Sequence, residues 1–117
     1  MESGALVETA AGVIVRGEND DADANGATIS LLGTINADTV EIYGNDDNDV
    51  VTIGNVVSGT ETTIWTYEGS DTINIRTIDE VTTVNAGDDG DTVNVGSNAP
   101  TAGGNVNGIS ASLLING

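Results

Sequence analysis

The sequence predicts an all-β protein, and three observations favour a parallel β-solenoid with coils of about 20 residues. Val, Ile and Thr make up 39 of the 117 residues, and these β-branched side chains are favoured in strands. The chain also holds 16 Gly and 13 Asn, the residues that tight turns prefer. Acidic clusters recur along the chain with similar apolar residues on both sides of them. Many short strands joined by many turns are therefore expected.

The acidic clusters define a repeat. Residues 20–23, 46–49 and 88–91 share the order acid, acid, any residue, acid, and a weaker copy lies at 68–71. Their first acids are 26, 22 and 20 residues apart. Each of the last three clusters leads into an expected strand, at residues 50–53, 72–75 and 92–95. In each of them, two apolar residues two positions apart point the same way. Four positions before the first acid of each of these last three clusters stands a further apolar residue: Ile42, Ile64 and Val84.

Equivalent residues recur at fixed positions, and this favours one of two architectures. Stacked coils would bring these Val and Ile side chains into continuous inner ladders, which a single coil could not bury alone. The alternative is an antiparallel β-sandwich, which also has strands every 8 to 12 residues. A sandwich does not require equivalent residues to recur. We therefore favour the solenoid and keep the sandwich as the alternative.

The whole chain, residues 1–117, is expected to form a single module. Residues 13–17 and 113–117 are similar apolar strands that end in Gly, and they lie 100 residues apart. This similarity suggests that the module is one unit of a longer tandem array. Neighbouring repeats of the same chain would then be its partners.

The charge of the chain excludes several classes of function. Nineteen acidic residues against two arginines give a net charge of −17. Two isolated arginines cannot neutralise a phosphate backbone, so no nucleic acid partner is expected. The absence of His, Cys and Lys removes Ser-His-Asp and Cys-His catalysis, His/Cys zinc sites and P-loops, so no enzyme is expected. No stretch approaches the roughly 18 apolar residues of a membrane span, so no membrane insertion is expected.

The acidic turns suggest calcium binding. Carboxylates crowded on stacked turns repel one another, and a hard cation that takes 6 to 8 oxygen ligands would relieve this repulsion. The alternative for any single cluster is a solvated acidic edge that water and salt screen. Residues 21–26 also match the first half of an EF-hand loop, with Asp38 or Glu18 as a distant carboxylate to close the shell. The candidate ligands are Asp20, Asp21, Asp23, Asn25, Asp46, Asp47, Asp49, Asp71, Asp88, Asp89 and Asp91.

Residues 85–94 resemble the Gly-Gly-x-Gly-x-Asp-x-apolar-x nonapeptide of the RTX, or hemolysin-type, calcium-binding repeats. The resemblance covers residues 40–96 and implies a calcium-binding turn followed by a short strand of a parallel β-roll. The motif does not recur every nine residues, so a looser relative with one acidic turn per coil is implied. Similar stretches occur in tandem modules of very large bacterial or algal surface proteins. The matching positions are Gly87, Asp91 and Val93, then Gly44, Asp49 and Val51, and finally Asp71 and Ile73.

Three aromatic residues offer a second function. Tyr43 and Trp65 stand three positions before the first acid of their clusters, so they are expected to stack, with Tyr67 on the same strand as Trp65. Exposed aromatic faces suit sugar rings, although such a pair more often covers the edge of a core. The expected function is therefore a calcium-binding structural or adhesive module of a large secreted or cell-surface protein. The alternative is a carbohydrate-binding accessory module of a polysaccharide-active enzyme.

Overall fold

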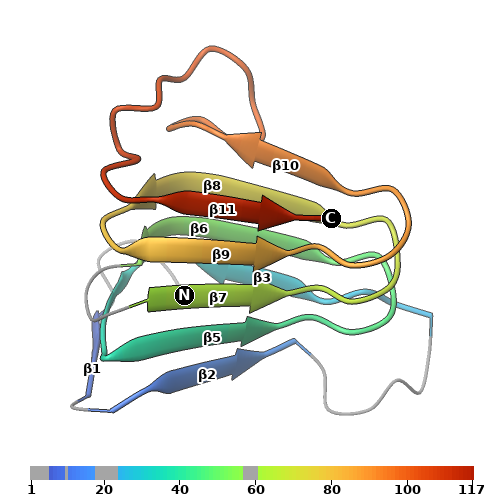
Figure 1. Ribbon diagram of the computed structural model, residues 1–117, viewed down its shortest axis with the longest axis horizontal. Coiled ribbons are helices and arrows are strands. Elements are labelled where there is room, and N and C mark those ends of the chain that lie inside the picture. Colours follow the sequence, from blue (N-terminus) through green and yellow to red (C-terminus); the bar gives the residue numbers. More distant parts are fainter. Residues whose placement is uncertain (1–5, 10, 18–23, 57–60) are drawn as a thin grey trace.

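The computed structural model describes residues 6–9, 11–17, 24–56 and 61–117, and every regular element among them is a β-strand (Figure 1). The strands form two sheets. Sheet A contains β1 (Leu6–Glu8), β3 (Thr28–Leu31), β4 (Thr34–Asn36), β6 (Val50–Val56), β8 (Thr72–Ile78) and β10 (Thr92–Val95). Sheet B contains β2 (Val13–Arg16), β5 (Thr39–Tyr43), β7 (Glu61–Trp65), β9 (Val81–Asn85) and β11 (Leu113–Asn116). No helix among the described residues is long and apolar enough to cross a membrane.

All strand pairings in the described part of the chain are parallel. In sheet B the order is β11-β9-β7-β5-β2, and in sheet A β6 lies between β3 and β8, with β10 beyond β8. The chain therefore passes from sheet B to sheet A and back, and it advances by one strand with each repeat. An antiparallel β-sandwich, the alternative from the sequence, does not have this parallel pairing.

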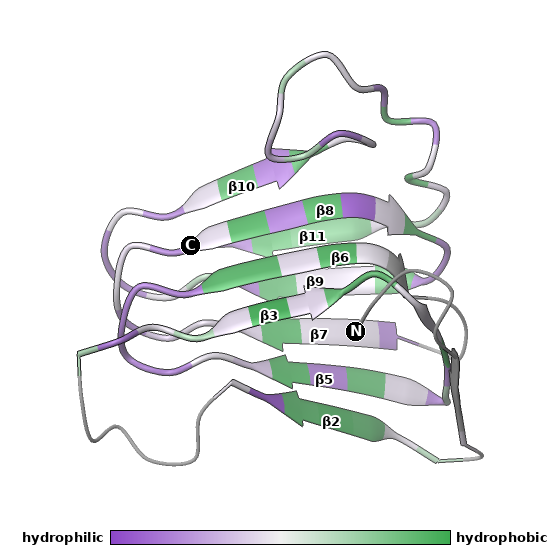
Figure 2. Cartoon of the chain, turned by 180° about the vertical axis from the view of Figure 1, so that it is seen from behind, coloured by the Kyte–Doolittle hydropathy of each residue, from purple (hydrophilic) through white to green (hydrophobic). Residues whose placement is uncertain are grey.

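The repeat predicted from the sequence is also the register of the sheets. Val51 pairs with Ile73, which pairs with Val93, and Ile42 pairs with Ile64, which pairs with Val84. These side chains form two columns, and all of them except the half-buried Val93 are buried members of the hydrophobic core. Figure 2 shows the alternation of apolar and polar bands along the strands of sheet A. Alternation arises because successive side chains of a strand point to opposite faces.

Two irregularities interrupt the repeat. The register of β6 against β8 shifts between Ile53 and Gly54 and again between Gly54 and Val56. The last unit contains a long connection, residues 96–112, between β10 and β11. Asn116 consequently bonds Asn85, 31 residues earlier, whereas the middle units are spaced by 20 or 22 residues.

Candidate functional site

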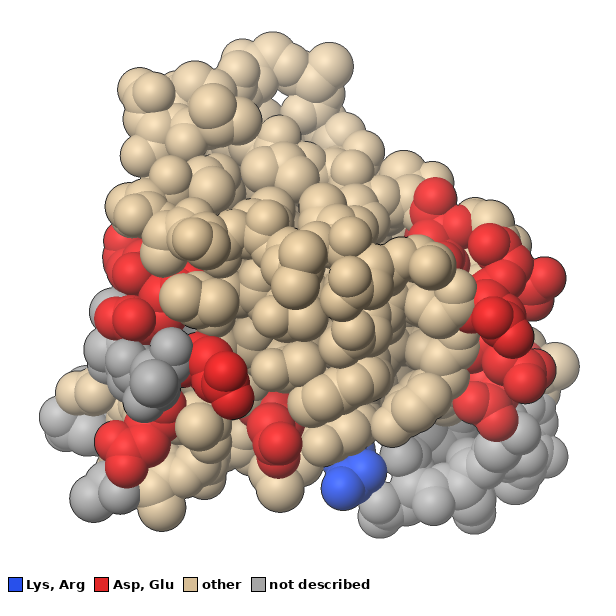
Figure 3. Space-filling view, viewed as in Figure 1, with Lys and Arg blue, Asp and Glu red and all other residues tan. Residues whose placement is uncertain are grey.

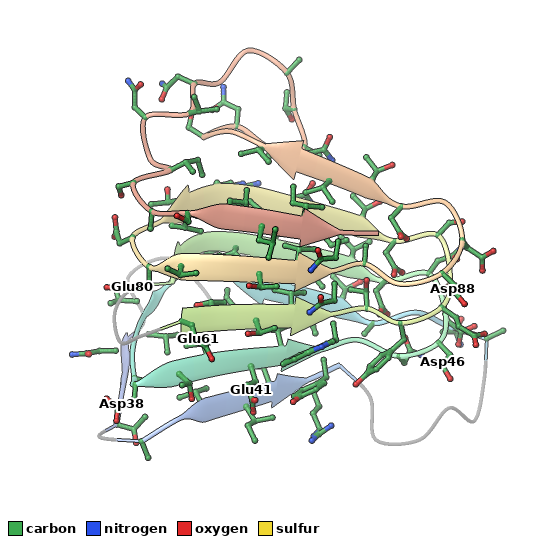
Figure 4. The ribbon with its side chains drawn as sticks, in the orientation of Figure 1. Asp38, Glu41, Asp46, Glu61, Glu80 and Asp88 are labelled. Carbon is green, nitrogen blue, oxygen red and sulfur yellow. The ribbon has the colours of Figure 1, made fainter. Side chains whose placement is uncertain are left out.

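Three of the four acidic clusters lie in the described residues, at equivalent corners where the chain leaves sheet B and enters sheet A. We call residues 44–49, 66–71 and 86–91 the corners. They follow β5, β7 and β9 and lie one above the other at one edge of the molecule (Figure 4, Asp46 and Asp88). The last acid of each corner accepts a backbone N–H group from the preceding repeat, and we call these residues, Asp49, Asp71 and Asp91, the inner aspartates. The outer acids are Asp46, Asp47, Glu68, Asp88 and Asp89.

The inner aspartates form a hydrogen-bonded column that links successive corners. The backbone N–H of Asp49 donates to Oδ1 of Asp71 at 2.8 Å, and the N–H of Asp71 donates to Oδ1 of Asp91 at 3.0 Å. At the start of the column, Ala27 N donates to Oδ1 of Asp49 at 2.6 Å. Each carboxylate therefore accepts a backbone donor that a tight corner would otherwise leave without a partner.

Asp49 and Asp71 differ in their second oxygen. Oδ2 of Asp49 accepts the N–H of Asn45 at 2.9 Å. In the next corner Tyr67 takes the place of Asn45, and it adopts a left-handed backbone conformation with φ 70°. Oδ2 of Asp71 is buried and has no hydrogen-bond partner among the described residues. The hydroxyl of Thr66 is near this carboxylate, but it donates its single proton to the carbonyl oxygen of Ala86 at 2.8 Å.

Burial raises the pKa of both of these carboxyl groups, whose side chains are only 1% exposed. For Asp49, the N–H groups of Asn45 and Ala27 oppose the effect of burial, and the charges of Asp47 and Asp46 add to it. For Asp71, Thr66 and the N–H of Asp49 lower the pKa, and the charges of Asp49 and Asp91 raise it. A desolvated carboxylate beside two others favours its neutral form or a neighbouring cation.

A small residue is needed where each corner begins. A Cβ atom at Gly44 would overlap Oδ2 of Asp49 and would lie 3.3 Å from Cα of Thr66. The equivalent positions in the next two corners are Thr66 and Ala86, which are also small. Gly44 thus lets the Asp49 carboxylate lie close against the backbone.

The outer acids face solvent or the corner surface. Asp46, Glu68, Asp88 and Asp89 are exposed, and Asp47 is half-buried, with Oδ2 accepting from Nδ2 of Asn45 at 3.4 Å. Figure 3 shows acidic side chains gathered at this edge. Within the described part of the chain, no three acidic groups come close enough together to hold a metal ion. The outer acids therefore offer carboxylate oxygens, in pairs and not in a preformed cage.

The N-terminal candidates are placed only in part. Asp20, Asp21 and Asp23 lie outside the described residues. Asn25 is exposed, and its carbonyl oxygen accepts from Nδ2 of Asn45 at 3.4 Å, so this segment contacts the first corner. Asp38, a suggested distant ligand, lies at the opposite edge from Asp46 (Figure 4). It is therefore not positioned to complete a site with Asn25.

Tyr43 and Trp65 stack as predicted, and the Tyr43 ring is covered on both faces. The ring centroids of Tyr43 and Trp65 are 4.8 Å apart and their planes differ by 7°. On the neighbouring strand β2, Arg16 lies over the Tyr43 ring, with Cζ 4.5 Å from the centroid. Tyr67 is not on the strand with Trp65 as expected, because β7 ends at Trp65 and Tyr67 belongs to the corner. The Tyr43 ring is thus covered on both faces and offers no free face to a sugar ring.

Sequence reasoning missed two features of the acidic surface. One is a second acidic edge at the other end of the sheet B strands, where Asp38, Glu61 and Glu80 lie (Figure 4). These acids are not clustered in the sequence, and only the register of the strands brings them together. The other is Asn48, whose Oδ1 accepts the N–H of Ser70 at 2.7 Å and so ties one corner to the next. In the sequence Asn48 stands between Asp47 and Asp49, where an Asn is typical of an ordinary turn.

Comparisons of this chain with protein-family models, with curated proteins and with solved structures find no match.

Proposed function

We propose that the chain is a structural or adhesive spacer, a parallel β-solenoid module of a large secreted or cell-surface protein, whose acidic corners bind Ca²⁺. The observation that carries the proposal is the stacking of the three corners. Outer acids project from successive corners along one edge, and the inner aspartates bond each corner to the next. A cation bound at any corner would therefore stabilise the neighbouring units as well.

The residues fit Ca²⁺ in their chemistry. Asp46 with Asp47, and Asp88 with Asp89, would each supply carboxylate oxygens, and water and backbone carbonyls complete a shell of 6 to 8 oxygens in such sites. The unpartnered Oδ2 of Asp71 is a further oxygen in the middle corner. Asp49 fits less well as a ligand, because both of its carboxylate oxygens already accept backbone N–H groups.

The mechanism is a linkage between cation binding and folding. A net charge of −17 opposes the compact state, and a cation that binds only the folded state offsets part of this repulsion. At a hundredfold excess over its dissociation constant, such a cation stabilises the fold by about 2.7 kcal/mol per site. The module would be rigid in millimolar calcium and looser in a chelator.

Calorimetric titration of the chelator-treated chain with Ca²⁺ tests the proposal directly. We expect heats of binding with a defined stoichiometry, and a higher melting temperature by circular dichroism in Ca²⁺ than in chelator. Mg²⁺ at the same ionic strength serves as the control, because it requires octahedral geometry and retains its waters. Equal melting temperatures in Ca²⁺, Mg²⁺ and chelator would exclude the calcium mechanism.

A further inference from the structure

The C-terminal end of the stack has an open sheet edge. Strand β11 is the last strand of sheet B, and among the described residues it pairs only with β9. Unpaired N–H and C=O groups on such an edge are a template for another strand, and natural proteins usually block them with charges, bulges or proline. Strand β11 itself contains neither a charged residue nor a proline.

This end of the molecule is also uncharged and partly apolar. All charged residues of the chain lie at or before Asp91, so residues 92–117 carry none. Figure 3 shows the region above the acidic edges free of acidic and basic side chains. Ile115 pairs with the buried Val84 and belongs to the inner column, yet it is 45% exposed because no further unit covers it. An inner column left open in this way favours the addition of another coil.

The opposite end of sheet B has a matching strand. Strand β2 is the first strand of this sheet and pairs only with β5 among the described residues. Val15 pairs with Ile42, and the column continues through Ile64 and Val84 to Ile115. Residues 13–16 of β2 and 113–116 of β11 therefore occupy the same four columns at the two ends of one sheet.

The backbone hydrogen bonds at the ends of these strands follow a single pattern. In each pair, the residue after the strand donates its N–H to the last carbonyl oxygen of the next strand. Continued by one step beyond β11, the pattern would join the N–H of Gly117 to the carbonyl oxygen of Arg16 in another molecule. The four observed bonds are Gly17 to Tyr43, Gly44 to Trp65, Thr66 to Asn85 and Ala86 to Asn116, at 2.8–3.1 Å.

We propose that the chain associates head to tail, with β11 of one molecule pairing in parallel with β2 of a second copy. The pairing would extend sheet B without a break, and would cover Ile115 of one copy with Val15 of the next. The C-terminal end of one molecule would bring no charged side chain to this contact, and β2 of the other would bring Arg16, so β11 and β2 themselves add no acidic side chain to the contact. Because the contact is heterologous, it leads to open filaments or rings and not to two-fold dimers.

Disulfide cross-linking tests the orientation, since the chain contains no cysteine of its own. Ile14 and Leu114 lie in the same outer column and are 57% and 55% exposed. In the proposed contact their Cα atoms would be one strand spacing apart, about 4.8 Å, which a disulfide can bridge. We expect Ile14→Cys and Leu114→Cys proteins, mixed with oxidised glutathione, to form the mixed disulfide several-fold faster than either forms its own dimer.

The control for cross-linking is Val81→Cys, which is also exposed but lies on β9, inside the stack. It should form a mixed disulfide with Leu114→Cys no faster than by random collision. Equal rates for Ile14→Cys and Val81→Cys would overturn the proposal. Faster dimers of Leu114→Cys with itself would overturn it too, because they would show a two-fold contact.

Sedimentation velocity over a range of concentrations provides a second test. We expect the unmodified chain to associate with rising concentration and Ile115→Lys to lose this association. Leu114→Lys adds the same charge on the outer face and should retain it. A chain that stays monomeric, or two variants that associate equally, would contradict the proposal. The inference extends the proposed spacer function but does not depend on Ca²⁺. Both association tests are therefore run in chelator. A negative result in them would leave the calorimetric test of Ca²⁺ binding unaffected.

Discussion

The carboxylate of Asp71 accepts the backbone N–H of Asp49, 22 residues earlier in the chain, at 2.8 Å. This bond joins two corners that are neighbours only because the repeat stacks them. It also gives the two residues different roles. Both oxygens of Asp49 accept backbone donors, whereas Oδ2 of Asp71 has no partner among the described residues.

The first prediction contrasts Asp49→Asn with Asp71→Asn. An amide has one acceptor oxygen, so in Asp49→Asn its NH₂ group would face the N–H of Ala27 or Asn45, at a cost of about 1–3 kcal/mol. In Asp71→Asn the oxygen can keep the N–H of Asp49, and the NH₂ group can donate to Thr66. We expect urea unfolding in chelator to show a loss of stability for the first variant and no loss for the second. Equal losses would contradict the assigned roles.

The second prediction concerns pH. Burial raises the pKa of Asp49 and Asp71 in the folded state above the ordinary value of 3.8. The folded state therefore holds these protons more tightly than the unfolded state, so the stability they contribute is present below pH 3.8 and is lost as the pH rises through the raised pKa values. In chelator, we expect the melting temperature to rise as the pH is lowered from 7 toward 4, and to rise less in Asp71→Asn. A melting temperature that falls over this range would refute the prediction.

Much of the fold follows from the sequence alone. The inner columns could be predicted because Ile42, Ile64 and Val84 stand at one distance from their acidic clusters, and a parallel stack turns equal spacing into direct contact. The stacking of Tyr43 on Trp65 follows from the same register. These predictions succeed because they depend only on which residues are equivalent.

The direction in which the acids point could not be predicted in this way. Asp46 and Asp49 belong to one acidic cluster, and in the sequence both resemble exposed metal ligands. Asp49 is buried because backbone N–H groups from its own corner and from Ala27, 22 residues earlier, surround its carboxylate. Tyr67 was misplaced for a similar reason. Its equivalents are Asn45 and Gly87, and these turn residues already indicated a corner and not a strand.

The third prediction concerns Gly44. In Gly44→Ala the new methyl group would overlap the Asp49 carboxylate, and we expect a loss of about 1–3 kcal/mol, as for other overpacked sites. Gly90 lies in an equivalent turn, but a Cβ atom there would have nothing within 4 Å. Gly90→Ala should therefore be neutral, or stabilising by up to about 1 kcal/mol. Denaturant unfolding of the two variants gives the comparison, and similar midpoints would argue against close packing at Gly44.

The fourth prediction separates bound Ca²⁺ from general relief of charge. The double variant Asp88→Asn, Asp89→Asn removes two charges from the corners, and Asn tolerates the left-handed φ of 80° at Asp89. The control, Glu61→Gln with Glu80→Gln, removes two charges from the opposite edge (Figure 4). We expect only the corner variant to lose stabilisation by Ca²⁺. If both variants lose the same stabilisation, the cation acts by screening and has no site at the corners.

The fifth prediction concerns the stacked rings. Tyr43 is enclosed between Arg16 and Trp65, so the stacked pair contributes to the stability of sheet B, and the Tyr43 ring offers no open face. A double-mutant cycle of Tyr43→Ala and Trp65→Ala should give a coupling of about 0.5–1.5 kcal/mol, as for other aromatic pairs. We expect oligosaccharides to leave the fluorescence of Trp65 unchanged, since Tyr43 already occupies one face of its ring. A saturable change in emission that Tyr43→Ala abolishes would instead restore carbohydrate binding as the function of this face.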